Sequence, residues 1–173
     1  MAEVRIQPAK PGETPTIVEF IIKARQDMFP FLDQSSNNQL AQSELANFRN
    51  TYLENPRGAF LTAHADGRLI GTIAYRAYDG RFSHFSLESE VDQVVEIARL
   101  YVLPEFRQAG VASNLFNTLL GMAQRSGVKQ LYLHTHPFLP NARGFWERHR
   151  FSVVTVDNDP VWQTIHMNRT LGN

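Results

Sequence analysis

Apolar residues recur every three to four positions in several stretches of the chain, and this spacing predicts helices. Residues 16–29, a segment from Ser43 to Asn55-Pro56, residues 110–125 and residues 141–149 are the expected helices. Pro30, Asn55-Pro56 and Ser126-Gly127 provide the signals that end the first three. Four helices are therefore expected.

Short apolar or alternating runs between these stretches predict strands at residues 4–7, 59–63, 69–75, 94–102, 130–135, 151–156 and 161–167. Asp66-Gly67 separates the second and third runs and predicts a hairpin, because both central residues of a type I′ turn need positive φ. Residues 78–92 are more polar and are expected to form an irregular excursion. Strands before, between and after helices indicate an α/β (α+β) fold with helices packed on a mixed sheet.

Length and composition favour a single domain over residues 1–173, since 173 residues at 43% hydrophobic content suit one core. Seventeen Lys and Arg balance seventeen Asp and Glu, so no net charge attracts nucleic acid or anionic lipid. The chain has no Cys, which excludes disulfides and thiolate chemistry. The first residues do not resemble a secretory signal, and no apolar run reaches the roughly 20 residues of a membrane span. We therefore expect a cytoplasmic protein without a membrane or nucleic-acid partner.

The segment from Glu96 to Ala112 carries the strongest candidate chemistry. A strand runs into a tight turn and a helix opens at Gly110, so unpaired N–H groups should converge at the positive end of the helix dipole. Gly110 lets the main chain approach an oxygen closely or adopt positive φ. Ala112 has a small side chain that leaves room at the first helical turn, and Arg107 adds a charged donor. This pattern favours binding of a diphosphate-bearing cofactor. Walker and G-x-G-x-x-G sequences do not occur, so P-loop and Rossmann interpretations lose their main support.

The pattern Arg107-x-x-Gly110-x-Ala112, after a strand that ends in Tyr101-Val102-Leu103-Pro104-Glu105, resembles the acyl-coenzyme A motif of the GNAT family of N-acetyltransferases. Residues 141–151, with sequence NARGFWERHRF, are similar to the later family segment Asn-x-x-x-Phe-Tyr-x-x-x-Gly-Phe. Two positions depart from the family: Trp146 replaces a Tyr that protonates the leaving thiolate, and Arg150 replaces a Gly. The order of elements agrees over residues 4–167. The resemblance implies a mostly antiparallel sheet of six to seven strands with about four flanking helices.

The resemblance also implies an acyl-CoA dependent N-acyltransferase that moves acetyl from acetyl-CoA to the primary amine of a small molecule. It implies that Leu100, Tyr101 and Val102 pair with the pantetheine arm as though it were an added strand. The diphosphate would be held by main-chain donors of Arg107, Gln108, Ala109, Gly110, Val111 and Ala112, together with the Ser113 hydroxyl. The Asn141 side chain would meet the cofactor near the gap between the strands at 94–102 and 130–135.

The acceptor amine must lose a proton before it attacks, because an alkyl ammonium has a pKa of about 10. Glu96 is the candidate base, directly or through water; its alternative role is a solvated or salt-bridged strand carboxylate, for example with Arg99. Tyr101 and Tyr132 are candidate acids, since the Trp146 indole N–H is not acidic enough. A backbone N–H near Leu100 or Tyr101 would hold the oxyanion. Direct transfer in a ternary complex is favoured because no Cys and no G-x-S-x-G elbow is present.

Several residues keep two interpretations. His134 and His136 lie two apart on a strand, but two neutral ligands make a poor metal site, so no metal is expected. Arg143, Arg148 and Arg150 meet a cofactor phosphate or form a solvated charged face. Residues 28–32 line an acceptor pocket or plug the core. The acidic residues Glu88, Glu90, Asp92, Asp157 and Asp159 would favour a cationic acceptor if they line its mouth.

Two other functions stay open. Acetylation of a protein lysine or N-terminus would need an open, shallow acceptor groove. A non-catalytic acyl-CoA binding or sensing module would fit the loss of the family Tyr at Trp146. Dimers are common in the family, so a homodimer is expected by analogy alone.

Overall fold

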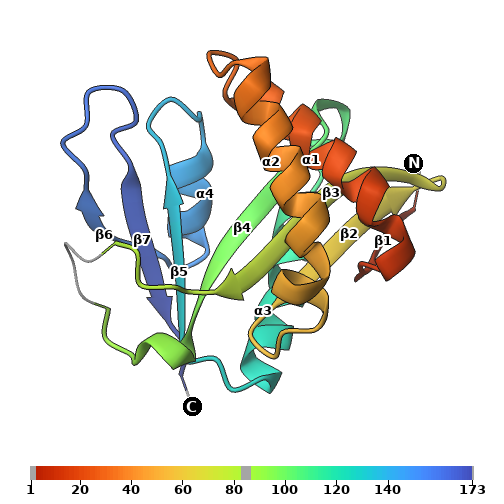
Figure 1. Cartoon of the computed structure of the whole chain (residues 1–173). Helices are drawn as coiled ribbons and strands as arrows, with labels where there is room; N and C mark the ends of the chain where they lie inside the picture. The colour runs from red at the N-terminus through yellow and green to blue at the C-terminus, as the bar shows by residue number, and fades with distance from the viewer. Residues whose placement is uncertain (1–2, 83–86, 173) are drawn as a thin grey trace. The chain divides into compact units, whose positions relative to one another are not determined.

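The computed structural model describes residues 3–82 and 87–172, and the chain divides into two compact units (Figure 1). Unit 1 contains residues 1–76 and 98–122; unit 2 contains residues 77–97 and 123–173. The strand order is β1-β2-β3-β4-β5-β7-β6, and β4 contributes its first four residues to unit 2 and the others to unit 1. The β4–β5 pair is parallel, whereas β1–β2, β2–β3, β5–β7 and β6–β7 are antiparallel. The predicted mixed, mostly antiparallel sheet is confirmed, and a single domain over residues 1–173 stays a prediction.

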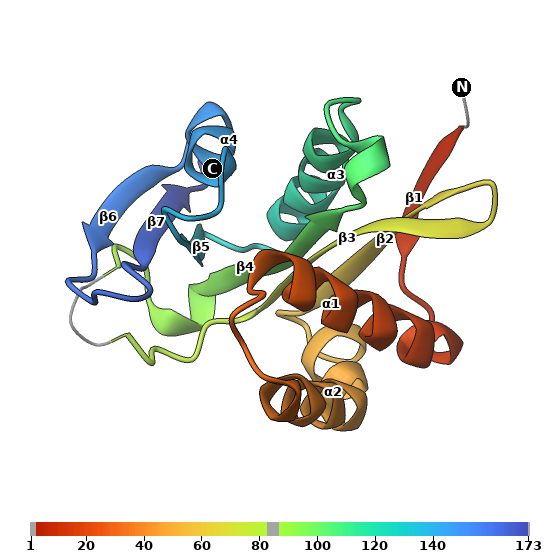
Figure 2. The ribbon, with the colours of Figure 1, turned by 90° about the horizontal axis from the view of Figure 1, so that it is seen from above.

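Unit 1 packs helices on both faces of its strands. Its elements are β1 (Val4–Pro8), α1 (Thr14–Met28), α2 (Gln34–Phe48), β2 (Ala59–Ala65), β3 (Arg68–Ala77), the later part of β4 (Val94–Val102) and most of α3 (Val111–Arg125). Figure 2 shows α1 and α2 on one face of these strands and α3 on the other. Under α1 and α2, the rings of Phe48, Tyr52 and Phe60 lie 4.8 to 5.1 Å apart between centroids and pack with Ile17 and Ile21.

Unit 2 contains the start of β4, β5 (Gln130–Thr135), α4 (Ala142–Arg148), β6 (Ser152–Val156) and β7 (Ile165–Thr170). Tyr78, Val94 and Tyr132 form one buried cluster of this unit. Residues 78–92 are mostly irregular, as expected, with one 3-10 turn at Val91–Gln93; residues 83–86 of this excursion lie outside the described residues.

The Asp66-Gly67 hairpin is confirmed, because these residues have φ of 51° and 77°. The second helix is longer than predicted: it begins at Gln34 rather than Ser43, and the Asp33 side chain caps it by accepting the Ser36 N–H at 2.8 Å. A π-helical turn, Arg49–Leu53, then extends it.

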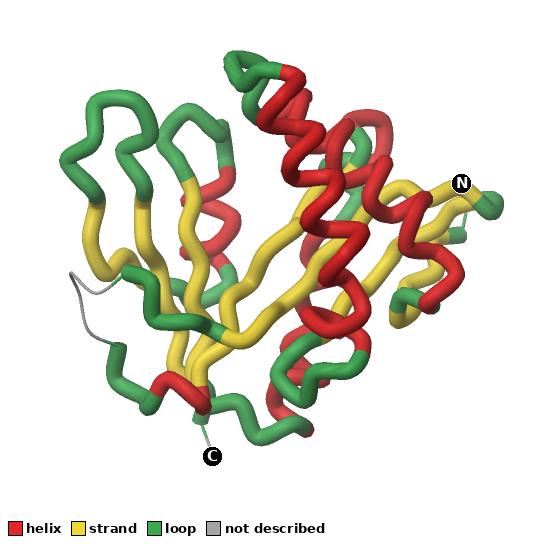
Figure 3. Tube along the Cα trace, in the orientation of Figure 1, coloured by secondary structure: helices red, strands yellow, loops and turns green. Residues whose placement is uncertain are grey.

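The predicted strand at 161–167 is wrong in its first half. Asp159 accepts the N–H groups of Val161 and Trp162 at 2.7 and 2.9 Å, which holds them in a turn. Residues 157–164 therefore form a loop between β6 and β7 (Figure 3), and β7 begins at Ile165.

Across the described part of the chain, no helix combines the length and apolar character needed to cross a membrane. The same residues contain no group of three or more His, Asp or Glu side chains able to hold a metal ion.

Candidate active site

The turn between β4 and α3 presents a row of unpaired amides. Gln108 and Gly110 have φ of 63° and 83°, and the first helical bond runs from the Asn114 N–H to the Gly110 carbonyl at 3.0 Å. Among the described residues, no acceptor takes up the N–H groups of Gln108, Ala109, Gly110, Val111 and Ala112. These donors lie at the N-terminus of a 15-residue helix, where the dipole adds positive potential. The turn has the donor geometry of an anion site.

Arg107 makes hydrogen bonds with residues just before the row of unpaired amides. Its backbone N–H donates to the Pro104 carbonyl at 3.2 Å, and its Nε donates to the Val102 carbonyl at 2.8 Å. The guanidinium also lies 5.1 Å from the centre of the Tyr101 ring and 3.4 Å from an Asp27 oxygen. The available main-chain donors therefore start at Gln108, and Arg107 braces the end of β4.

Close packing fixes the position of the turn within unit 1. The Leu103 N–H donates to the Ile70 carbonyl at 2.9 Å, which joins β3 to the end of β4. A Cβ at Gly71 would lie 3.3 Å from both the Tyr101 carbonyl oxygen and the Leu115 side chain. Glycine thus lets β3, β4 and α3 approach one another directly before the turn.

A strained residue interrupts β4 just before the predicted cofactor residues. Arg99 has φ of 61° inside the strand, a conformation that costs an ordinary residue about 1–2 kcal/mol. Two contacts hold it: the Thr72 hydroxyl donates to the Arg99 carbonyl at 2.6 Å, and the Arg99 guanidinium pairs with Glu44 of α2. This left-handed residue directly precedes Leu100 and Tyr101, and the sequence pattern gave no sign of it.

The pairing of β4 with β5 is short. In the chain outside residues 1–2, 83–86 and 173, their parallel register covers Val94, Val95 and Glu96 only, although β4 continues to Val102. The later residues of β4, including Leu100, Tyr101 and Val102, therefore have no β5 partner in this register. Such an edge can accept an extended ligand as an added strand.

Tyr101 holds its proton tightly. Burial, together with a 2.8 Å hydrogen bond from its hydroxyl to an Asp27 oxygen, raises the pKa of Tyr101 to about 12. A phenol of this kind is a weak donor at neutral pH.

Glu96 is buried in unit 2 and paired at two points. Its side chain is 1% exposed, and its two oxygens accept from the Arg81 guanidinium at 2.7 and 2.8 Å. His134 Nδ1 lies 3.5 Å away. Burial alone would lower the pKa of Arg81, but the Glu96 carboxylate raises it above its usual value. The suggested partner Arg99 is wrong, because Arg99 pairs with Glu44 and Arg81 takes its place.

Tyr132 belongs to a buried chain of polar groups in unit 2. Its hydroxyl lies 2.6 Å from His166 Nδ1, and His166 Nε2 lies 3.1 Å from an Asp157 oxygen. Tyr132 and His166 are fully buried. Burial, and then the Glu96 carboxylate, raise the pKa of Tyr132 above its usual value. As with Tyr101, the proton is held inside the protein.

The later family segment lies in unit 2. Asn141 has φ of 70° directly before α4, and its carbonyl accepts the Phe145 N–H at 2.9 Å. Its contact with a cofactor stays a prediction. Trp146, at the position of the family Tyr, is 6% exposed and packs against Phe145 and Phe151 with ring centres 4.9 and 5.2 Å apart. It is a core residue of this unit.

The contacts of residues 28–32 and of His136 decide between the interpretations left open for them. Phe31 is 54% exposed, so residues 28–32 do not act as a core plug throughout, although Met28 packs against the Phe20 and Tyr101 cluster. His136 stacks on Phe138, and its Nδ1 lies 3.0 Å from the Trp162 carbonyl oxygen. Burial, and to a smaller extent His166, lower the pKa of His136.

In this fold, the fourth strand of a mixed sheet leads into a helix, and the amides of the connecting turn are not used by the described part of the chain. Such an α/β protein can hold an anionic group beside the edge of a strand. Residues 18–151 match the profile of the acetyltransferase (GNAT) family, which covers more than half of the chain. The chain therefore belongs to the GNAT family of acetyltransferases.

Similar proteins agree with this assignment. Uncharacterized N-acetyltransferases of Mycobacterium bovis and Mycobacterium tuberculosis are 29% identical over 102 residues, which cover 59% of this chain and 58% of each relative. The match thus spans somewhat more than half the length of these relatives. A GNAT acetyltransferase from Staphylococcus aureus has a TM-score of 0.76 at 17% identity and covers 98% of this chain and 100% of its own. The PaiA N-acetyltransferase from Thermoplasma acidophilum, solved in complex with coenzyme A, has a TM-score of 0.68 at 17% identity over 98% of this chain and 99% of its own.

Proposed function

We propose that this protein is an acyl-CoA dependent N-acyltransferase that transfers acetyl from acetyl-CoA to the primary amine of a small molecule. One observation carries the proposal: five consecutive amides, from Gln108 to Ala112, have no acceptor within the described chain and open α3 at a glycine with positive φ. They match the oxygens of a diphosphate. The coenzyme A bound in the Thermoplasma relative supports this choice of cofactor.

The unpaired later part of β4 supports the same cofactor. Main-chain groups of Leu100, Tyr101 and Val102 would pair with the pantetheine arm as an added strand. The Ser113 hydroxyl and Asn141 would add side-chain contacts. The left-handed Arg99 would direct the Leu100 or Tyr101 N–H to the thioester oxygen, where negative charge develops during attack.

The amine nitrogen would attack the thioester carbonyl carbon directly, with Glu96 taking the ammonium proton through water. The C–S bond then breaks and coenzyme A leaves as the thiolate. A thiol with a pKa of about 8.5 needs little help from an acid near neutral pH. This fits a site in which Tyr101, with its pKa raised to about 12, and Tyr132 both keep their protons.

The test combines binding and turnover. Calorimetry with coenzyme A and acetyl-CoA should give saturable binding. Thiol release should then be measured with amino acids, polyamines, aminoglycosides and peptides, and one small amine should be preferred. Glu96→Gln should abolish turnover and keep cofactor affinity, while Glu88→Gln, which removes a carboxylate from the irregular segment before β4, should keep both. Absence of any binding to either thioester or thiol would refute the proposal.

A second candidate, a non-catalytic acyl-CoA binding module, is favoured by one observation. Both oxygens of the Glu96 carboxylate accept hydrogen bonds from Arg81, and the hydroxyls of both candidate acids are hydrogen-bonded to internal partners. Acetyl-CoA binding without thiol release over the whole amine panel would select this module. A preferred peptide amine would instead select protein acetylation. Gel filtration tests the homodimer expected by analogy, and cell fractionation tests the cytoplasmic location.

A further inference from the structure

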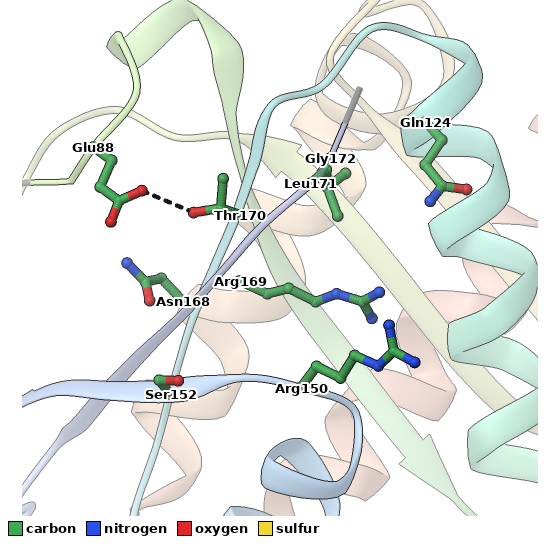
Figure 4. A pocket seen from close by; sticks show the side chains of 9 residues that line it. All are labelled: Glu88, Gln124, Arg150, Ser152, Asn168, Arg169, Thr170, Leu171 and Gly172. Carbon is green, nitrogen blue, oxygen red and sulfur yellow. Dashed lines mark hydrogen bonds between the residues drawn. The ribbon is translucent and has the colours of Figure 1, made fainter.

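Unit 2 contains a surface pocket of about 420 Å³ that the proposed transfer reaction does not use (Figure 4). The pocket lies where β7 ends and β6 begins, with the last turn of α3 at its side. Seven of its nine described lining residues have polar or charged side chains, and the other two are Leu171 and Gly172: Glu88, Gln124, Arg150, Ser152, Asn168, Arg169, Thr170, Leu171 and Gly172. The role of this pocket follows from its charged groups.

Two arginines extend side by side into the pocket. Figure 4 shows the guanidinium groups of Arg150 and Arg169 next to each other, with Gln124 facing them from α3. Arg169 donates one hydrogen bond, to the His149 carbonyl at 3.1 Å. The Arg150 guanidinium has no hydrogen bond or ion pair with any residue that the structure describes. Burial, and then the charge of Arg150, lower the pKa of Arg169. The two cations therefore repel each other without a neutralising partner between them.

Glu88, the one carboxylate among the described residues that line the pocket, contacts Thr170 and not the arginines. Glu88 accepts the Thr170 hydroxyl at 3.1 Å, on the side of the pocket away from the arginines (Figure 4). The Ser152 hydroxyl and the Asn168 amide lie on paired positions of β6 and β7, and neither makes a side-chain hydrogen bond within the described residues. The pocket thus has two guanidinium groups, and it has two neutral side chains that can donate hydrogen bonds.

The backbone at Arg150 adds an independent observation. Arg150 follows α4 with φ of 69°, a left-handed conformation in which glycine is free of strain. Arginine at this position makes the fold less stable than glycine would. A residue kept against the local backbone preference indicates that its side chain has a use.

We propose that Arg150 and Arg169 form a binding site for a small oxyanion of the phosphate type, assisted by Ser152 and Asn168. Two adjacent guanidinium groups can each donate a pair of parallel hydrogen bonds to such an anion. The bound anion would remove the repulsion between the arginines. This site is built from residues other than those of the β4–α3 turn, and its occupant is either free phosphate or the phosphate of a small metabolite.

The experiment follows backbone amide NMR shifts of the intact chain during titration with inorganic phosphate, at constant ionic strength maintained with chloride. Saturable shifts should occur at residues lining the pocket. Arg150→Gly should weaken phosphate binding at least about tenfold, since a hydrogen bond between charged groups is lost. Arg150→Lys, which keeps the charge without the fork, should give an intermediate loss. Arg148→Gln removes a charge from the last turn of α4 but none from the pocket lining, and should bind phosphate as the wild type does.

Coenzyme A titrations identify the source of the anion. If Arg150→Gly leaves coenzyme A affinity within about twofold while phosphate binding is lost, the site is separate from the cofactor site. Equal loss of both would identify a cofactor phosphate as the occupant and overturn a separate site. Unchanged phosphate affinity in Arg150→Gly and in Arg169→Gln, or identical shifts with chloride alone, would also overturn it. Because the Gly110 turn is probed only by coenzyme A, failure here leaves the proposed function intact.

Discussion

Gly110 and Gly127 provide a matched pair of substitutions at the two ends of α3. They have φ of 83° and 79°, and at both positions an added Cβ would have no atom within 4 Å. Gly110→Ala and Gly127→Ala therefore introduce the same backbone strain and no clash. Alanine in the left-handed conformation destabilises the folded state by about 1–2 kcal/mol. It also lowers the conformational entropy of the unfolded chain, which offsets about half of that cost. Both variants should lose about 1 kcal/mol of unfolding free energy, or about 2–4 °C in Tm.

Cofactor affinity should separate the two variants. The open space above Gly110 is where the proposed diphosphate approaches the free amides, so a methyl group there should displace it from one or two of them. Each lost hydrogen bond to a charged group is worth about 1.5–3 kcal/mol. The Kd for coenzyme A should therefore rise about 10- to 100-fold in Gly110→Ala and stay unchanged in Gly127→Ala.

Thermal unfolding and calorimetry with coenzyme A measure both quantities on the same samples. Equal coenzyme A affinity in the two variants would refute the assignment of the turn, because the strain is matched and only the position differs. A Tm loss in Gly110→Ala much larger than in Gly127→Ala would show instead that Gly110 stabilises the fold in some other way.

Three further outcomes follow from the structure. Glu44→Gln removes the carboxylate from a mostly buried pair with the Arg99 guanidinium, so urea unfolding should show a loss of about 2–3 kcal/mol; a loss below about 0.5 kcal/mol would contradict the importance of this pair. Arg150→Gly should raise Tm by about 2–4 °C, since glycine relieves the positive φ, and a lower Tm would contradict this. His136 and His149 both have a pKa lowered mainly by burial, so the unfolded chain takes up protons at these residues before the folded chain does as the pH falls. The free energy of unfolding should therefore decrease below about pH 6.5, and it should decrease less steeply in His136→Gln. Parallel pH curves for the two proteins would exclude His136 as a contributor.

Local signals in the sequence predict the parts of the fold that local chemistry determines. Asp66-Gly67 can form only a few turn types, and the structure has both residues at positive φ as the hairpin requires. For Gly110 the sequence allowed close approach or positive φ, and the structure has it at φ of 83° before α3. The start of α2 was missed because residues 34–42 are largely polar and carry no strong apolar period, so its beginning depends on the Asp33 cap.

Contacts between distant residues explain what the sequence could not predict about the candidate site. Glu96 was correctly suspected of an ion pair, but Arg81 lies 15 positions away in the irregular excursion, where no periodicity relates the two. Arg99 looks like any charged strand residue until Glu44 and Thr72 are seen to hold it in a left-handed conformation. The Arg150 and Arg169 pair similarly depends on β6 and β7 meeting at one end of the sheet.

The strained Arg99 gives a direct test of how β4 contributes to transfer. Thr72→Val removes the hydroxyl that holds the Arg99 carbonyl at 2.6 Å, and Thr62→Val removes an equally buried hydroxyl that donates to the Gln7 carbonyl at 3.3 Å. Each change should cost about 1 kcal/mol of unfolding free energy.

Only Thr72→Val should lower kcat, because, of the two hydroxyls, this one holds Arg99 in the conformation that we propose directs the Leu100 or Tyr101 N–H toward the developing oxyanion. Loss of a positioned donor costs up to about 10²–10³ in kcat, and partial misalignment should cost about tenfold. Coenzyme A affinity should change much less than kcat in Thr72→Val, because the amides of the α3 turn are untouched and only the proposed pairing of Leu100 and Tyr101 with the pantetheine arm is disturbed. If Thr62→Val and Thr72→Val lower kcat equally, the left-handed Arg99 is a feature of folding and not of transfer.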